Sequence, residues 1–256
     1  MYQTPGFPSQ PAPQLTRRPS IHPTFASISL HDTDKIRLLK FPAGDVAVLQ
    51  DLIARAWRLG IQKVRNFDAA HEIKVRGNPW VSSSWGEDKV AARRLMCGML
   101  AELWEMGWVV NAIVEVGKRK FDKDTLIFRK QEPPPPSTTW FIISFDRGDT
   151  LRIIDGSLEV GAIVLRAFDP EKIRKHTVTP DGSVFEIKFR GYPWRAMGTE
   201  TVQARLLILT LMECLEQLGY LLYASLDLED GHEGGDADVW FCCEQRDRRS
   251  WLGQHY

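Results

Sequence analysis

The sequence predicts an α+β fold made from two copies of one ββαβαββ unit, with largely antiparallel sheets, helices on one face and a pseudo-two-fold relation between the copies. Segment 72–80 reads EIKVRGNPW and segment 186–194 reads EIKFRGYPW, so seven of nine positions agree across a separation of 114 residues. The agreement continues in register on both sides, as it does in internal duplications. Most of the chain is therefore expected to consist of two related α+β units.

Each unit is predicted to open with a β-hairpin. The apolar runs 25–30 and 36–39 flank one polar turn, and the runs 140–145 and 151–154 flank another. Short apolar runs bounded by turn residues are typical of strands. The two hairpins correspond at a constant separation of 115 residues.

A helix is predicted after each hairpin. Apolar residues recur at helical spacing after Asp45 and after Ser157, and both of these residue types are good N-terminal caps. Gly60 and Pro170 mark the expected helix ends.

The repeated segment itself is predicted to be a half-buried strand. Ile73 and Val75 alternate with the charged residues of 72–76, and 186–190 repeats the pattern. Alternation of this kind places the apolar residues on a buried face and the charged residues on a solvent-exposed face. The following proline ends the strand, because it lacks the N–H group that a strand ladder requires.

A longer helix is expected after each of these strands. The first runs from about Glu87 to Gly107 and its counterpart from about Thr199 to Gly219. Apolar residues cover a wider arc of the second helix, so we expect it to be the more buried of the two. Closing strands are expected at 109–116, 125–128, 220–226 and 238–241, and additional short strands at 62–65 and 172–176 remain an open alternative.

Five segments are predicted along the chain. A tail rich in proline, serine and glutamine, expected to be disordered, precedes two repeats that a proline-rich spacer joins. The boundaries are 1–24 for this tail, 25–130 and 139–245 for the repeats, 131–138 for the spacer and 246–256 for a polar C-terminal tail. The apolar strand at 140–145 and the apolar second helix favour packing of the repeats into one body over two separate domains.

The composition argues against several classes of protein. The 256 residues include 33 basic and 33 acidic side chains, which does not match the electrostatic field of a general nucleic-acid or membrane-surface binder. No apolar run reaches the roughly 20 residues of a membrane-spanning helix, and the first residues lack a secretory-signal pattern. Four cysteines without zinc-site spacing or disulfide density indicate reduced thiols and a cytoplasmic or nuclear protein.

Charged residues of the repeated segment are the first candidate binding residues. Arg76 and Arg190, next to Lys74 and Lys188, could hold a carboxylate or a phosphate in a two-pronged contact. The alternative, which we favour, is a ladder of cross-strand ion pairs that keeps the sheet face soluble.

Trp80 and Trp194 are the second pair of candidates. Exposed tryptophans at a Gly-x-Pro-Trp turn could form the rim of a partner-binding pocket. The alternative, again favoured, is a turn whose indole closes the end of the core, because large indoles are mostly buried.

Loops and motifs add little evidence for catalysis. Loop 117–123 is basic and its counterpart 227–238 is acidic, an asymmetry that could orient self-association or a partner. The acidic loop lacks the ligand spacing of a calcium-binding loop, so neither a metal nor a cofactor is expected. The sequence has no nucleophile elbow, phosphate-binding loop, zinc-protease helix or dinucleotide-binding motif.

The leading hypothesis is therefore a non-enzymatic module that binds protein or peptide partners through the charged strand faces and the Pro-Trp rims. The alternative is a small anionic-ligand binder, or an enzyme, with its site in the cleft between the repeats, since pockets favour such junctions. That alternative requires the two arginines and the two tryptophans to converge on one concave surface. An RNA-binding sheet is the least expected function, because the open strand faces carry charged residues instead of aromatic ones.

Overall fold

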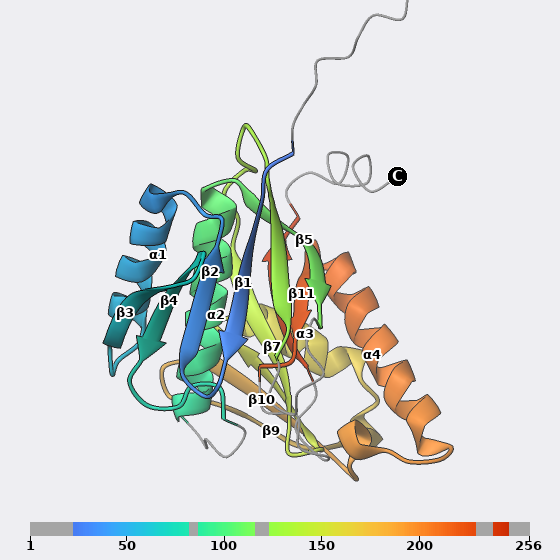
Figure 1. The fold of residues 1–256 in the computed structure, drawn as a ribbon. Coiled ribbons are helices and arrows are strands. Elements are labelled where there is room, and N and C mark those ends of the chain that lie inside the picture. The colour runs from blue at the N-terminus through green and yellow to red at the C-terminus, as the bar shows by residue number, and fades with distance from the viewer. Residues whose placement is uncertain (1–22, 82–86, 116–122, 229–237, 246–256) are drawn as a thin grey trace, which may run out of the picture.

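The computed structural model describes residues 23–81, 87–115, 123–228 and 238–245, which form two copies of one unit (Figure 1). The first copy contains β1 (Phe25–His31), β2 (Lys35–Leu39), α1 (Ala43–Ala56), β3 (Ile61–Phe67), β4 (Ala70–Val75), α2 (Glu87–Glu105), β5 (Trp108–Val114) and β6 (Thr125–Lys130). The second contains β7 (Trp140–Asp146), β8 (Thr150–Ile154), α3 (Leu158–Ala167), η1 (Pro170–Lys172), β9 (Ile173–Val178), β10 (Val184–Phe189), η2 (Pro193–Arg195), α4 (Glu200–Gln217), β11 (Tyr220–Leu226) and β12 (Val239–Glu244).

Each copy forms its own six-stranded antiparallel sheet. Sheet A has the strand order β3-β4-β2-β1-β6-β5, and sheet B has the corresponding order β9-β10-β8-β7-β12-β11. The hairpin registers also correspond, since Ser29 pairs with Arg37 and Ser144 pairs with Arg152. The predicted α+β class and internal duplication are confirmed. The strand that the sequence left open is present in both copies as β3 and β9, so the unit is ββαββαββ.

The helix ends follow local sequence signals, with one difference from prediction. The Ser157 side chain accepts a hydrogen bond from the backbone N–H of Val160 at 3.2 Å and caps α3 as expected. Helix α1 begins at Ala43 instead, so Asp45 lies within its first turn, and its carboxylate accepts a hydrogen bond from the Trp108 indole at 2.7 Å. In the described part of the chain, no helix is long and apolar enough to cross a membrane.

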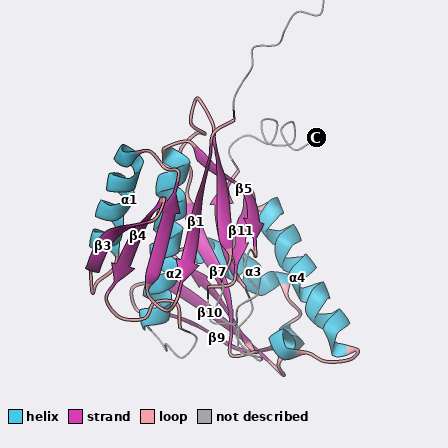
Figure 2. Cartoon of the chain, in the orientation of Figure 1, coloured by secondary structure: helices cyan, strands magenta, loops and turns pink. Residues whose placement is uncertain are grey.

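The elements form four layers: sheet A, then α1 and α2, then sheet B, then α3 and α4 (Figures 1 and 2). The core around α1 and α2 contains Ile28 of sheet A together with Ile142 and Ile154 of sheet B. The core around α3 and α4 draws its sheet residues, such as Phe145, from sheet B. Sheet B is thus covered on both faces, and the two copies form one body.

Helix α4 is more exposed than α2, so the prediction that it would be the more buried helix is wrong. Its apolar residues Val202, Leu206, Leu209 and Met212 are 56%, 48%, 53% and 42% exposed. Helix α2 lies between two sheets, whereas α4 is covered by a sheet on one side and lies at the edge of the molecule (Figure 1). The wide apolar arc of α4 therefore supplies one face to the core and leaves another in contact with solvent.

The four cysteines are free thiols in this fold. Burial raises the pKa of Cys97 and of Cys243 to about 12. Burial also raises the pKa of Cys214 and of Cys242. Because the thiolate is the reactive form, these side chains act as small apolar groups of the core.

Candidate functional site

A buried carboxylate organises the outer face of sheet A. Glu72 on β4 accepts hydrogen bonds from Arg37 at 2.8 Å and from Arg65 at 2.7 Å, and its side chain is only 2% exposed. Burial alone would raise the pKa of Glu72, but the two arginines lower it. The predicted solvent exposure of this residue is wrong, because the guanidinium groups cover it. The favoured interpretation, a cross-strand ion-pair ladder, describes these contacts.

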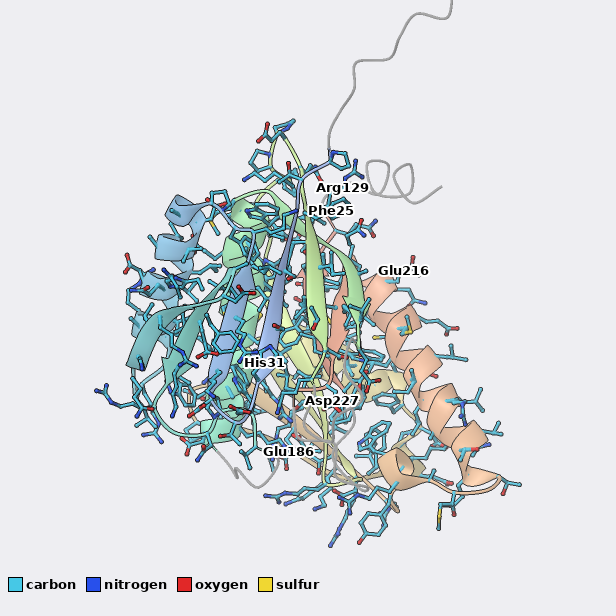
Figure 3. All side chains as sticks on the ribbon, in the orientation of Figure 1. Phe25, His31, Arg129, Glu186, Glu216 and Asp227 are labelled. Carbon is cyan, nitrogen blue, oxygen red and sulfur yellow. The ribbon has the colours of Figure 1, made fainter. Side chains whose placement is uncertain are left out.

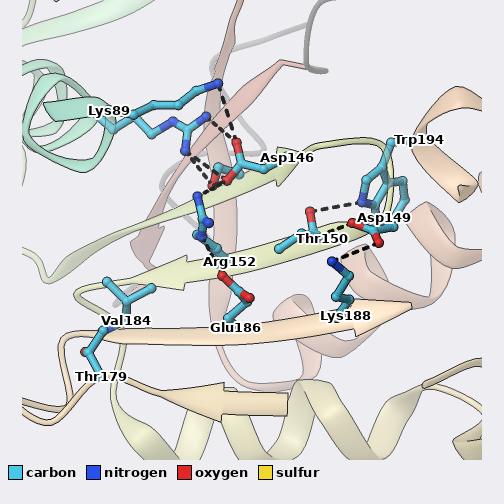
Figure 4. Close-up of polar contacts among 12 residues, drawn as sticks. Lys89, Asp146, Asp149, Thr150, Arg152, Thr179, Val184, Glu186, Lys188 and Trp194 are labelled. Atoms are coloured by element: carbon cyan, nitrogen blue, oxygen red, sulfur yellow. Dashed lines mark hydrogen bonds and ion pairs between the residues drawn. The ribbon is translucent and has the colours of Figure 1, made fainter. Parts of the chain in front are cut away.

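The second copy repeats this pair and extends it toward the first copy. Arg152 on β8 donates to Glu186 on β10 at 2.9 Å and to Asp146 at the end of β7 at 2.7 Å (Figure 4). Asp146 also accepts a bond from the hydroxyl of Ser144 at 3.1 Å. The ladder on sheet B therefore gains a second carboxylate, where sheet A has His31 at the corresponding position.

Helix α2 supplies the cation that joins the two copies. Arg93 donates to both carboxylate oxygens of Asp146, at 2.6 and 3.1 Å, and to the Ser144 hydroxyl at 3.0 Å. The side chains of Arg93 and Asp146 are each 2% exposed. Burial alone would raise the pKa of Asp146, but Arg93, Arg152 and Lys89 lower it to about 2. This is a buried, multiply bonded ion pair between the repeats.

Two further contacts complete the junction. Arg94 forms a two-pronged pair with Asp155 at 2.7 and 2.8 Å on the exposed side of α2. At the opposite end, Trp104, Trp140 and Tyr223 meet edge to face, with ring centroids 4.9 to 5.9 Å apart. The hydroxyl of Tyr223 accepts the backbone N–H of Val110 on β5 at 2.7 Å, and burial raises the pKa of that hydroxyl.

The four cationic candidates lie near the ends of β4 and β10, the two strands of the repeated segment, which we call the signature strands. Lys74 forms an ion pair with Asp34 at 3.4 Å, and Lys188 forms the corresponding pair with Asp149 at 3.2 Å. The Arg76 guanidinium donates to the carbonyl of Ile61 at 3.1 Å. Arg190 is exposed just after β10.

The two tryptophan candidates differ in burial. Trp80 is 0% exposed and belongs to the core that α2 shares with sheet A. Trp194 is half-buried and donates to the carbonyl of Thr150 at 3.0 Å (Figure 4). Its ring contacts Phe145 and Phe189 edge to face. Trp80 and Trp194 lie in different cores. The cavity between the copies, described next, is lined by arginines other than Arg76 and Arg190, so the four candidates do not converge on it.

A cavity of about 660 Å³ lies at the junction of the copies. Its lining includes Arg58, Val90 and Arg94 from the first copy and Arg152, Pro180 and Val184 from the second. Each arginine already faces a carboxylate: Arg58 bonds Asp88, Arg94 bonds Asp155, and Arg152 bonds Asp146 and Glu186. The positive charges of this cavity are therefore largely compensated within the protein.

A second hollow, of about 450 Å³, lies beside the N-terminal half of α4. We call it the aromatic hollow, and its main lining residues are Phe145, Trp194, Ile208, Trp240, Arg205 and Asp238. The rings of Trp194 and Trp240 each meet Phe145 edge to face, at 4.8 and 5.1 Å. The lining segment that contains Trp194 is preceded in sequence by Tyr192 and followed by Met197, which are 66% and 81% exposed.

Sequence reasoning identified Trp194 in this hollow and missed its other aromatic residues. Trp240 corresponds to Leu126, and Phe145 corresponds to Leu30, so the second copy has aromatic side chains where the first has leucines. An alignment of the two copies could have identified these aromatic replacements from the sequence. The pairing of Arg93 with Asp146 could not be predicted in that way, because it depends on how the two copies pack.

No metal site is evident among the described residues, in which no group of three histidine, cysteine or acidic side chains could hold an ion. Most of the acidic loop 227–238 and of the basic loop 117–123 lies outside those residues.

One protein-family model matches the chain twice, over residues 24–129 and 139–243. No curated protein and no solved structure gives a match. The two matched ranges contain sheet A with its helices and sheet B with its helices. The chain therefore belongs to the family that this domain defines, and it carries two copies of the domain.

Proposed function

We propose that the protein is a non-enzymatic module that binds an extended segment of a protein partner in the aromatic hollow of its second copy. The observation that carries this proposal is the aromatic lining of that hollow, together with the exposed apolar side chains on the segment that contributes Trp194 and Ile208 to it. Tyr192, Met197 and four residues of α4 lie within 21 residues of sequence and are all more than 40% exposed. Contiguous apolar surface of this kind is typical of interaction sites.

The comparison between the copies supports a binding role for this surface. In the first copy the corresponding residues Leu30, Trp80 and Leu126 are at most 2% exposed and serve the core. In the second copy Phe145 and Trp240 replace the two leucines with larger aromatic side chains, and together with Trp194 they line a concave surface. The fold does not need an open hollow at this position, since the first copy closes it.

The chemistry of the hollow fits an extended or proline-rich peptide. Faces and edges of Trp194 and Trp240 can receive apolar or proline side chains, as aromatic grooves do for extended peptides. Arg205 and Asp238 place one cation and one anion in the lining, where they can bind polar groups of a peptide. A hollow of about 450 Å³ accommodates a few side chains, which leads to moderate affinity.

Selection from a random peptide display library, with the intact chain as bait, tests this function. We expect enrichment of sequences rich in proline and aromatic residues, with dissociation constants on the order of 1–100 µM. Trp194→Ala should weaken binding of a selected peptide by at least about fivefold, because an aromatic anchor typically contributes more than 1 kcal/mol.

The matched control is Trp80→Phe, which changes the corresponding tryptophan in the first copy. It should leave peptide affinity within about twofold, because Trp80 lies in the other core. Equal loss of binding in both variants, or selection of no peptide by the wild-type chain, would overturn the proposal.

Small-ligand binding at the junction is the second candidate function, and the cavity of about 660 Å³ is the observation in its favour. An anionic ligand would have to compete with Asp155 for Arg94. We expect a metabolite at about 100 times its dissociation constant to stabilise the wild-type chain by about 2.7 kcal/mol. A thermal-unfolding screen should show that shift in the wild type and lose it in Arg94→Gln. A shift of equal size in both would place the ligand elsewhere.

A further inference from the structure

We infer that the outer face of α4 is a self-association surface, on which a second copy of this chain docks its own α4 in antiparallel orientation. The inference does not depend on peptide binding in the aromatic hollow, although it uses the same exposed apolar residues of α4, and Arg205 belongs to both surfaces. Its starting point is the internal duplication, which provides two versions of one helix in one molecule.

Helices α2 and α4 correspond residue by residue at a separation of 112. Ala92 and Arg93 correspond to Ala204 and Arg205, and Gly107 corresponds to Gly219. The two glycines end their helices with nearly equal φ angles of 81° and 82°. The faces of the two helices can therefore be compared directly.

The face that α2 buries against sheet B is open on α4. Arg93 and Leu100 are 2% and 1% exposed, whereas their counterparts Arg205 and Met212 are exposed. Among the described residues, the Arg205 side chain bonds only to the carbonyl of Thr201 in its own helix, at 3.1 Å. Figure 3 shows the side chains of α4 extending from the outer side of the molecule. By internal precedent, this face of the unit is one that packs against protein.

Sheet A of a second molecule does not fit this face. Arg205 corresponds to Arg93, so docking in the manner of α2 on sheet B would require an acid at the position of Asp146. Sheet A has His31 there (Figure 3). Arg205 would therefore lack a carboxylate partner, and repeated head-to-tail docking would also build an open-ended fibre.

Antiparallel pairing of two α4 helices does fit. At about 100° per residue, one side of α4 presents residues that all lie within about 60° of Leu209: Val202, Arg205, Leu206, Met212 and Glu213. A two-fold axis beside Leu209 places Arg205 of one chain opposite Glu213 of the other, and Leu206 opposite Met212. Apolar contacts are thus flanked by two equivalent ion pairs, and such a two-fold contact closes as a dimer.

Sedimentation equilibrium of the full chain tests the inference. We expect a dimer with a dissociation constant on the order of 1–100 µM. Leu209→Glu should raise that constant at least about 100-fold, because it places two carboxylates at the crossing point. Leu158→Glu is the matched control: Leu158 is 54% exposed on α3, and its change should leave the constant unaltered.

Charge reversal identifies the orientation. Arg205→Glu and Glu213→Arg should each weaken the dimer by about tenfold, because each places like charges opposite each other. An equimolar mixture of the two single variants should form a heterodimer, and the variant with both changes should dimerise like the wild type. Circular dichroism and melting temperature confirm that each variant is folded.

A monomeric mass for the wild type up to about 1 mM overturns the inference. So does a dimer that Leu209→Glu leaves intact, or two charge variants that do not rescue each other. If the chain is monomeric but still selects peptides through Trp194, the proposed function stands and the self-association does not.

Discussion

Replacing Arg93 by methionine is expected to lower the free energy of unfolding by about 3–5 kcal/mol, which makes it one of the two most damaging single changes considered for this protein. The substitution keeps most of the side-chain volume and removes the charge. It leaves the Asp146 carboxylate, 2% exposed, without its two-pronged partner. The cost comes mainly from the uncompensated buried charge, which Arg152 and the Ser144 hydroxyl offset only in part.

The control is the double variant Arg93→Met/Asp146→Leu, measured by urea unfolding beside both single variants. It should recover most of the loss, because an apolar pair of similar volume often replaces a buried ion pair at little cost. If the double variant is as unstable as the sum of the two single variants, the pair is not coupled and this account of the junction is wrong.

The pH dependence of the free energy of unfolding provides an independent measurement of the contribution of Asp146. The pKa of Asp146 is about 2 in the folded protein and about 3.9 in an unfolded chain. A depressed folded pKa contributes stability that is present above pH 4 and is lost as the pH falls toward 2. The wild-type chain should lose about 2 kcal/mol from this group over that interval. Asp146→Asn should show a smaller loss over the same interval.

Replacing Trp80 by alanine is expected to lower the free energy of unfolding by about 3–5 kcal/mol. Trp80 is 0% exposed among the apolar residues that α2 and sheet A share, so its loss leaves a large cavity. Among the described residues its indole N–H has no hydrogen-bond partner. Trp80→Phe should therefore cost much less, on the order of 1 kcal/mol, because it keeps most of the volume and breaks no bond.

The corresponding change in the second copy, Trp194→Ala, should cost about 1–2 kcal/mol, because that indole is half-buried and donates one hydrogen bond. Unfolding in guanidinium chloride, followed by circular dichroism, measures all three variants. Equal losses from Trp80→Ala and Trp194→Ala would contradict the distinction between a core tryptophan in the first copy and a surface tryptophan in the second.

Much of the fold could be predicted from local pattern. The duplication, the alternating signature strand and the helix-ending glycines depend on residues close together in sequence, and the structure confirms them. The additional strands β3 and β9 were left open because their outward side chains are mostly polar, and Arg65 and His176 give no clear apolar alternation. Pairing with β4 and β10 through the backbone decides their conformation.

The errors share one physical cause, which is the arrangement of the two copies. Apolar periodicity shows that α4 has a wide apolar arc, but it does not show what covers that arc. Sheet B covers the face of α2 that points away from sheet A. No described element covers the corresponding face of α4, which points away from sheet B. Glu72 was expected in solvent because charge alternates along β4, yet Arg37 and Arg65 from neighbouring strands enclose it.

The candidate site could be predicted only in part for the same reason. Trp194 was among the candidates, but the residues that face it across the hollow, Phe145 and Trp240, come from strands far apart in the sequence. The alternative of a ligand site between the repeats requires Arg76 and Arg190 to converge on one concave surface. In the structure they belong to different sheets, and Arg76 bonds to a backbone carbonyl of its own copy.

Hydrogen exchange of the intact chain, with and without a selected peptide, tests the central claim most directly: the second copy carries the binding surface at a position where the first copy is closed. The account predicts that peptide binding slows amide exchange in 190–212 and in β12, and leaves the corresponding segments 76–100 and β6 unchanged. Equal protection of both copies, or protection confined to the junction cavity between α2 and β10, would contradict it.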